Sequence, residues 1–232
     1  MHYFTILLSL GAALLGLSPA FADTPLHVLF IGDSHSVGTF GKTMDTVLSS
    51  LGAEQGGARV ETYASCGSSP DWWFSGHETP CGYFSDVDGK KTETAKHATP
   101  LLRELITHQD PDLIIIELGA NLMGDSLDHA QTTTREMLTL VSEQLAKKPG
   151  RRCFWIGPPN GRNKTEPKFS QLYDLIKTET IGICELFDSR LVTHYPATGG
   201  DGAHYDSLGP AGRLIAKAWA QSAFDQIKNA NP

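Results

Sequence analysis

The chain contains 232 residues with a formal net charge of −7, and its 26 acidic residues outnumber 19 basic ones. The acidic balance and the lack of a basic stripe argue against a nucleic-acid-binding protein. No stretch beyond the N-terminal segment is apolar enough to cross a bilayer, so we expect no membrane span.

Residues 1–22 have the features of an export signal. An apolar segment over residues 6–17 is too short to span a bilayer, and a small-x-small pattern of the kind that signal peptidase cleaves ends at Ala22. The segment lacks the usual positive start, and a buried N-terminal helix is the alternative. We expect a signal peptide over residues 1–22, a secreted or periplasmic location, and one domain over residues 23–232.

The remaining chain alternates short apolar runs with longer segments of helical period. The apolar runs predict strands over residues 26–31, 60–64, 113–118, 153–156 and 184–187. A helix is expected directly after the first strand, and further helices over residues 99–107, 130–148, 168–180 and 210–227. Such alternation is typical of a parallel sheet that is covered on both faces. The predicted fold class is α/β, a three-layer α/β/α sandwich with a five-stranded parallel sheet.

The four cysteines form an even set, which in an exported chain favours disulfides over metal ligands or free thiols. The sequence alone allows three pairings. The predicted strands favour a bond between Cys66 and Cys81 and a second between Cys153 and Cys184, which lie near the starts of two strands.

Polar residues and glycines follow the predicted strands at their carboxyl ends. Ser34 follows the first strand, Gly67 the second and Asn121 the third, and Asp201 and His204 come after the last strand and a loop. Ligands of open parallel sheets bind outside the carboxyl ends of the strands. We therefore expect these five residues to converge on one edge of the sheet.

These residue types fit acyl transfer to a serine. The hydroxyl of Ser34 needs a neighbouring base, for which His204 is the candidate, and Asp201 is placed to hold the imidazole in one tautomer. A developing oxyanion needs hydrogen-bond donors. The candidates are the backbone N–H groups of Ser34 and Gly67 and the side-chain amide of Asn121.

The sequence blocks that carry these residues resemble those of the SGNH hydrolases, the GDSL-type esterase superfamily. GDSHS supplies Ser34, Gly67 matches the second block, GAN supplies Asn121, and DGAH supplies Asp201 and His204. The resemblance implies a flavodoxin-like fold and a serine nucleophile with these residues in the catalytic and oxyanion roles. It covers nearly all of the chain after residue 22.

Two positions depart from the usual family pattern. Leu122 stands where many members carry Asp after the Asn, and His35 stands where the GDSL spelling has Leu. The GDSH spelling resembles that of SGNH domains that handle O-acyl groups on polysaccharides. We expect His35 to pack or to form a pocket wall, because neighbours in sequence do not share a helix face.

Each block also has an alternative explanation. Ser34 or Asp33 could cap the following helix, and the DGAHYD sequence could form a turn or an Asp/His metal site. Residues 86–89 resemble part of a calcium loop, but their spacing fits no EF-hand and favours a hairpin turn. We expect neither a metal nor an organic cofactor.

Three aromatic residues, Trp72, Trp73 and Phe74, lie inside the loop that a bond from Cys66 to Cys81 would close. Turn-forming residues flank the three, which favours a position on the pocket rim. Flat indole faces at a polar edge suit stacking on a sugar ring. The alternative is that these side chains fill the core beneath a long loop.

The sequence therefore predicts an exported serine esterase that acts through an acyl-enzyme on a small-molecule or glycan ester. Acetyl or another short acyl group on carbohydrate is the favoured substrate. A lysophospholipase, a thioesterase and an O-acyltransferase are alternatives, as is a carbohydrate-binding protein on the same scaffold. The sequence leaves the oligomeric state open.

Overall fold

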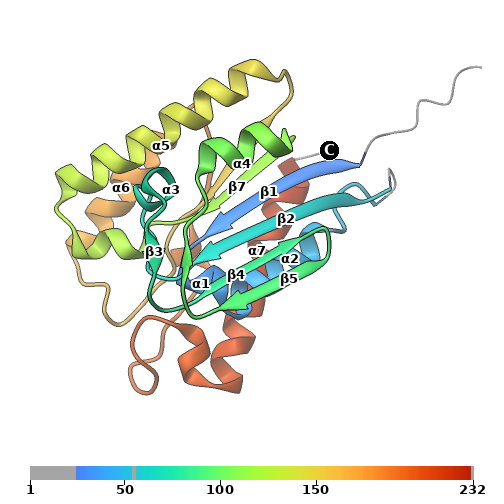
Figure 1. The fold of residues 1–232 in the computed structure, drawn as a ribbon. Helices are drawn as coiled ribbons and strands as arrows, with labels where there is room; N and C mark the ends of the chain where they lie inside the picture. Colours follow the sequence, from blue (N-terminus) through green and yellow to red (C-terminus); the bar gives the residue numbers. More distant parts are fainter. Residues whose placement is uncertain (1–24, 54–55, 231–232) are drawn as a thin grey trace, which may run out of the picture.

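A computed structural model describes residues 25–53 and 56–230, so the predicted signal peptide lies outside the described residues. A seven-stranded sheet forms the centre, with the strand order β5-β4-β2-β1-β7-β8-β9 (Figure 1). Its strands are β1 (Leu26–Gly32), β2 (Ala58–Ser65), β4 (Tyr83–Val87), β5 (Lys90–Thr94), β7 (Leu113–Glu117), β8 (Arg152–Ile156) and β9 (Glu185–Phe187).

The five strands predicted from the sequence are present, and β2, β1, β7, β8 and β9 pair in parallel. The prediction of a five-stranded, wholly parallel sheet is wrong, because β4 and β5 add an antiparallel hairpin at the β2 edge. All five residues of β5 are exposed, so this edge strand lacks the apolar run that marks a buried one.

The predicted hairpin turn within residues 86–89 is confirmed by the pairing of β4 with β5. Asp88 and Gly89 both adopt positive φ values, of 51° and 75°. An Asp-Gly pair with positive φ at both positions is the usual chemistry of a two-residue hairpin turn.

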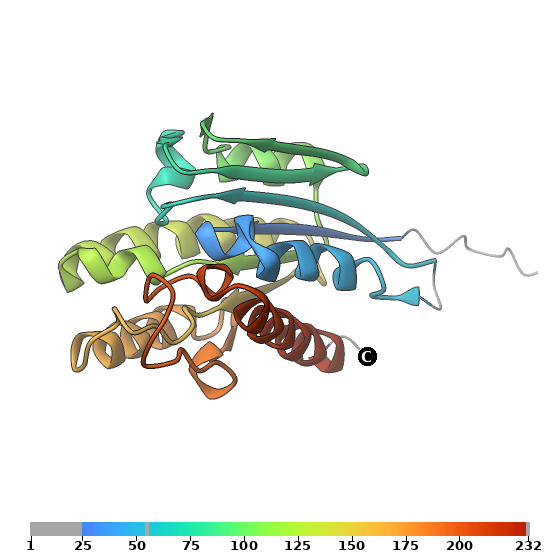
Figure 2. The same ribbon diagram turned by 90° about the horizontal axis from the view of Figure 1, so that it is seen from below.

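Helices cover both faces of the sheet. One face carries α3 (Trp72–Ser75), α4 (Leu102–Gln109), α5 (Leu127–Lys147) and α6 (Lys168–Thr180), and the other carries α2 (Thr39–Leu48) and α7 (Pro210–Ala230). Figure 2 shows α2 and α7 side by side on their face of the sheet. The short α1 (Ser34–Val37) leads from β1 into α2, so the expected first helix is broken at Gly38.

The connections contain several shorter elements. They are a two-stranded sheet of β3 (Glu78–Thr79) and β6 (His97–Ala98), and the 3₁₀ helices η2 (Ala120–Gly124), η3 (Ser189–Leu191) and η4 (Tyr205–Leu208). In the described part of the chain, no helix is both long and apolar enough to cross a membrane.

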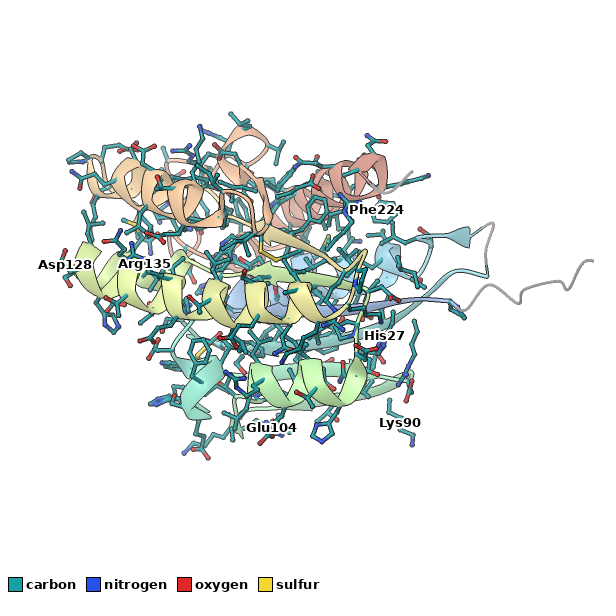
Figure 3. All side chains as sticks on the ribbon, turned by 90° about the horizontal axis from the view of Figure 1, so that it is seen from above. His27, Lys90, Glu104, Asp128, Arg135 and Phe224 are labelled. Carbon is teal, nitrogen blue, oxygen red and sulfur yellow. A yellow bond between two sulfur atoms is a disulfide. The ribbon has the colours of Figure 1, made fainter. Side chains whose placement is uncertain are left out.

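Two hydrophobic clusters hold the layers together. Successive side chains of a strand point to opposite faces, so Val28 and Phe30 of β1 pack with α2 and α7, whereas Leu29 and Ile31 pack with α4, α5 and α6. Burial on both faces explains the continuous apolar run of β1. Figure 3 shows the outer, polar sides of two of these helices, with Glu104 on α4 and Asp128 and Arg135 on α5.

Both predicted disulfides are present. Cys66 and Cys81 close the loop that contains α3, with Cα atoms 5.5 Å apart. Cys153 in β8 is bonded to Cys184 just before β9, with a Cα separation of 4.5 Å. These two strands are neighbours in the sheet, as the pairing requires.

We predict that replacing Cys153 and Cys184 together by Ser lowers the free energy of unfolding by about 3 to 4 kcal/mol, from the entropy of the opened loop. The bond lies at the amino ends of its strands, so any activity at the carboxyl edge should keep its kcat. Urea unfolding of the purified variant under non-reducing conditions measures the change. Unchanged stability would show that this bond does not constrain the unfolded chain.

Candidate active site

Ser34 stands at the carboxyl edge of the sheet, on the first turn of α1. Strand β1 ends at Gly32, and Asp33 caps α1 by accepting a hydrogen bond from the N–H of His35 over 2.9 Å. A Cβ atom on Gly32 would lie 2.0 Å from Ser36 Oγ, so only glycine permits this close turn. The cap therefore belongs to Asp33, and the hydroxyl of Ser34 is left available for another partner.

That partner is His204, which lies 170 residues further along the chain. Ser34 Oγ is 2.9 Å from His204 Nε2, and His204 Nδ1 is 2.7 Å from Asp201 Oδ2. An ionised carboxylate only accepts hydrogen bonds, so Nδ1 carries the proton and Nε2 accepts the proton of the Ser34 hydroxyl. The three predicted residues thus form one hydrogen-bonded chain.

Several donors converge on Asp201. Its Oδ1 accepts hydrogen bonds from the N–H groups of Ala203, over 2.9 Å, and His204, over 2.8 Å, and from Ser207 Oγ over 3.1 Å. Partial burial raises the pKa of Asp201, but the bonds from the Ala203 N–H and from His204 outweigh it and hold that pKa well below its usual range. Asp201 therefore stays charged beside the imidazole.

The segment that carries Asp201 and His204 is hydrogen-bonded to the start of α2. The carboxylate of Asp206 accepts a hydrogen bond from the N–H of Thr39 over 2.8 Å and another from the Thr39 hydroxyl. Gly38, the residue before α2, has no side chain to cap the helix, so Asp206 supplies the missing acceptor. Sequence reasoning missed this contact, although a helix start without its own cap was a signal.

His35 packs behind His204. Its ring centroid lies 5.3 Å from that of His204 and 5.5 Å from that of Trp219. Burial and the nearby charges of Lys164 and His204 hold the pKa of His35 well below its usual value. Its neutral ring packs as a pocket wall, in line with the interpretation of the sequence.

Asn121 lies in η2, beyond the end of β7, and contacts Asp33, the residue before Ser34, and the loop after β2. Its Nδ2 donates hydrogen bonds to Ser68 O over 2.9 Å and to Asp33 Oδ2 over 3.3 Å. In the described part of the chain, the backbone N–H groups of Ser34 and Gly67 have no hydrogen-bond acceptor. These two groups are therefore available as donors to a ligand.

The three aromatic residues of the Cys66–Cys81 loop have different environments. Trp73 is 0% exposed and belongs to the core, so its expected place on the pocket rim is wrong. Phe74 is partly buried against the same cluster. Trp72 is partly exposed, and its ring centroid lies 4.1 Å from that of His77.

Trp72 also lies close to Gly67, because a Cβ on that glycine would be 3.3 Å from Trp72 Cη2. Of the three aromatics, Trp72 is therefore the one that is both accessible and next to a candidate oxyanion donor. Leu122, the other departure from the family pattern, is buried in the core and packs there as an apolar residue.

Two buried carboxyl groups lie beside the site: Asp33, which the sequence suggested only as a helix cap, and Glu117, which was not singled out from the sequence. Burial raises the pKa of Asp33 to about 6, and burial together with the charge of Asp33 raises the pKa of Glu117 well above its usual value. Glu117 ends the apolar run of β7, so its carboxyl group is carried into the interior with that strand. Within the described residues no cluster of three or more His, Cys, Asp or Glu side chains could hold a metal ion.

The sequence matches no family model and no curated protein sequence. Many solved structures resemble the fold across most of their length, and three of them serve as examples. A carbohydrate acetylesterase family member from Sinorhizobium meliloti is 17% identical, with a TM-score of 0.53, over 88% of this chain and 98% of its own. The psychrotrophic esterase EstA from Pseudoalteromonas sp. is 15% identical, with a TM-score of 0.55, over 88% of this chain and 97% of its own.

A GDSL-like lipase from Bacteroides thetaiotaomicron is 12% identical, with a TM-score of 0.51, over 87% of this chain and 88% of its own. Likeness at this level of identity establishes the fold. The chain therefore shares the α/β fold of these esterases and lipases, and its own sheet ends in the antiparallel β4–β5 hairpin at the β2 edge.

We predict that Asp206→Ala lowers the free energy of unfolding by about 1 to 2 kcal/mol, because α2 then loses its cap acceptor. Asp225→Ala removes an exposed aspartate from the middle of α7 and serves as the control, with an expected change within about 0.5 kcal/mol. Chemical denaturation of both variants measures their free energies of unfolding. Equal stability of the two would show that Asp206 does not cap α2.

Proposed function

We propose that this chain, with its SGNH hydrolase fold, is an exported serine ester hydrolase. The observation that carries the proposal is the hydrogen-bonded chain from Ser34 through His204 to Asp201 at the carboxyl edge of the sheet. The resemblance of the sequence blocks and the esterase names of similar structures support it.

In the first half of the reaction, Ser34 Oγ attacks the carbonyl carbon of the ester while its proton passes to His204 Nε2. The charge of Asp201 stabilises the imidazolium through Nδ1–H. The carbonyl oxygen becomes an oxyanion, and the N–H groups of Ser34 and Gly67 and the amide of Asn121 are its donors. The bond to the alcohol then breaks, and the alcohol leaves with the proton from His204.

In the second half, water replaces the alcohol. His204 Nε2 takes a proton from the water as its oxygen attacks the acyl carbon, and a second oxyanion forms on the same donors. The bond from the acyl carbon to Ser34 Oγ then breaks, and Ser34 recovers its proton from His204. The products are a carboxylic acid and free enzyme.

Acetyl is the acyl group that we favour, because the GDSH spelling resembles that of SGNH domains that handle O-acyl groups on polysaccharides and one similar structure is named as a carbohydrate acetylesterase family member. Behind Ser34, the rings of His35, Tyr205 and Trp219 wall a cavity of about 10 Å³, which holds no more than about one water molecule. We therefore expect the acyl group to lie on the other side of Ser34, towards Gly67 and Asn121.

The exposed part of Trp72 supports an alcohol that is part of a carbohydrate. A partly exposed indole, next to Gly67 at the edge of the site, offers a platform for a sugar ring. One similar structure is named as a carbohydrate acetylesterase family member, which agrees with this choice.

Export fits the chemistry of the cysteines. Two disulfides hold the described chain, and such bonds persist in oxidising compartments. Together with the signal-like segment at residues 1–22, they support a secreted or periplasmic enzyme.

The proposal predicts that Ser34→Ala abolishes hydrolysis of an aryl acetate while the fold is kept, because no other group can form the acyl-enzyme. Ser50→Ala changes an exposed serine at the end of α2 and is the matched control. Initial rates and circular dichroism of both proteins measure activity and folding. Parent-like turnover in folded Ser34→Ala would contradict the assignment, and an inactive parent would favour the carbohydrate-binding alternative.

For the substrate, we predict that Trp72→Ala lowers kcat/KM for an acetylated oligosaccharide at least about fivefold, whereas aryl acetate hydrolysis changes little. Loss of the indole removes stacking with the sugar, and Trp72→Phe, which keeps a flat ring, should lose less. Parallel kinetics on the two substrates, with a long-chain lipid ester as a third, measure the difference. Equal losses on all substrates, or a preference for the long-chain ester, would reject the carbohydrate and favour a lipase or thioesterase.

A further inference from the structure

Two carboxyl groups lie buried directly behind the nucleophile. Asp33 precedes Ser34, Glu117 is the last residue of β7, and both side chains are 0% exposed. The backbone joins them as well, since the N–H of Asp33 donates to the carbonyl of Glu117 over 3.2 Å. Two negative charges in this dry position would repel each other strongly, so the pair needs a proton or a cation.

The hydrogen bonds around Glu117 indicate where a proton resides. Its Oε2 accepts a bond from Ser36 Oγ over 2.8 Å. Its Oε1 is buried and finds no donor among the described residues, which is costly for a carboxylate oxygen. If the Glu117 carboxyl group is protonated, it can donate to the Asp33 carboxylate, which lies within its hydrogen-bonding reach. The raised pKa of Glu117 agrees with this state.

Asp33 is in turn the acceptor that holds the amide of Asn121. Both N–H bonds of that amide are occupied, one by Ser68 O at 2.9 Å and the other by Asp33 Oδ2 at 3.3 Å. To serve an oxyanion, the amide must release one acceptor. The longer bond to Asp33 is the weaker one, so it is the bond that the oxyanion replaces.

We propose that Asp33 and Glu117 share one proton and act together as the positioning unit for the Asn121 amide of the oxyanion hole. The bond from Glu117 reduces the charge on Asp33, so Asp33 orients the amide without competing strongly for it. Without that proton donor, a fully charged Asp33 would bind the amide more tightly and would oppose the negative charge of the oxyanion.

Two other titratable groups, Lys164 and His204, interact with the pair, and the ring of His35 lies nearby. Lys164, from the loop between β8 and α6, interacts electrostatically with both carboxyl groups and donates to Pro159 O over 2.6 Å. His204 faces Asp33 from the loop before η4, and His35 lies on α1. When the two carboxyl groups share one proton, the pair carries one negative charge. The positive charge of Lys164 stabilises that charge.

The inference rests on the proposed function for its kinetic consequences, but the protonation of Glu117 can be measured without any activity. We expect the infrared spectrum at pH 7 to contain the stretch of a protonated carboxyl group that Glu117→Gln lacks. A difference spectrum that shows the loss of a carboxylate instead would overturn the shared proton, whether or not the protein hydrolyses esters.

The kinetic test uses a double-mutant cycle. Glu117→Gln keeps a donor to Asp33 and an acceptor for Ser36, so kcat should stay within about threefold of the parent. Glu117→Met removes both and should lower kcat about tenfold with little change in KM. Asn121→Ala, which deletes one oxyanion donor, should lower kcat by about 10²-fold or more. Glu61→Met is the control, since Glu61 is equally buried but lies in the middle of β2, and its kcat should match the parent's.

If Glu117 acts through Asn121, Glu117→Met should cost less than about threefold once Asn121 is Ala. Three results would each overturn the positioning role. They are full additivity of the losses in Glu117→Met and Asn121→Ala, an unchanged kcat in Asn121→Ala, and a Glu117→Gln variant that is as impaired as Glu117→Met. An equal loss in Glu61→Met would assign the effect to general destabilisation and would also overturn it. Failure of the proposed function has a different signature, because the parent itself would then be inactive.

Discussion

The 2.9 Å hydrogen bond between Ser34 Oγ and His204 Nε2 joins residues that are 170 positions apart in the sequence. The fold must bring two distant segments of the chain together to form it. Ser34 is positioned by the end of β1, which lies inside the sheet between β2 and β7. His204 is positioned by a loop that Asp206 fastens to the start of α2. A shift of about 1 Å in the position of either residue would break this hydrogen bond. The end of β1 and the loop that carries His204 must therefore be held rigidly relative to each other.

Burial of charge is the second constraint at this edge of the sheet. Asp201, on the exposed side, is charged because several N–H and O–H groups donate to it. Asp33 and Glu117, on the interior side, have few donors, and burial favours their protonated forms. Under the proposed function, this contrast places a fixed negative charge next to the imidazole and keeps excess negative charge away from the candidate oxyanion donors, which is the polarity that acyl transfer requires.

Much of the fold could be predicted from the sequence because the determinants are local. The apolar runs of the parallel strands and the turn residues after them lie within a few positions of each other, and the predicted strands favoured the two disulfides that the structure contains. The hairpin strand β5 was missed because its residues are exposed and polar. Trp73 was misplaced because a three-residue aromatic run does not reveal which ring turns inward. Asp206 and Glu117 act through partners far away in the sequence, and a single sequence does not report such contacts.

The central claim is that Ser34, activated by His204, is the one nucleophile. It is tested most directly by incubating the protein with a serine-reactive phosphonate and locating the adduct by peptide mass spectrometry. The account predicts one phosphonyl group per chain, on the peptide that contains Ser34, and a labelling rate that falls by orders of magnitude in His204→Ala. Labelling of a different residue, or labelling of Ser34 at the same rate without His204, would contradict it.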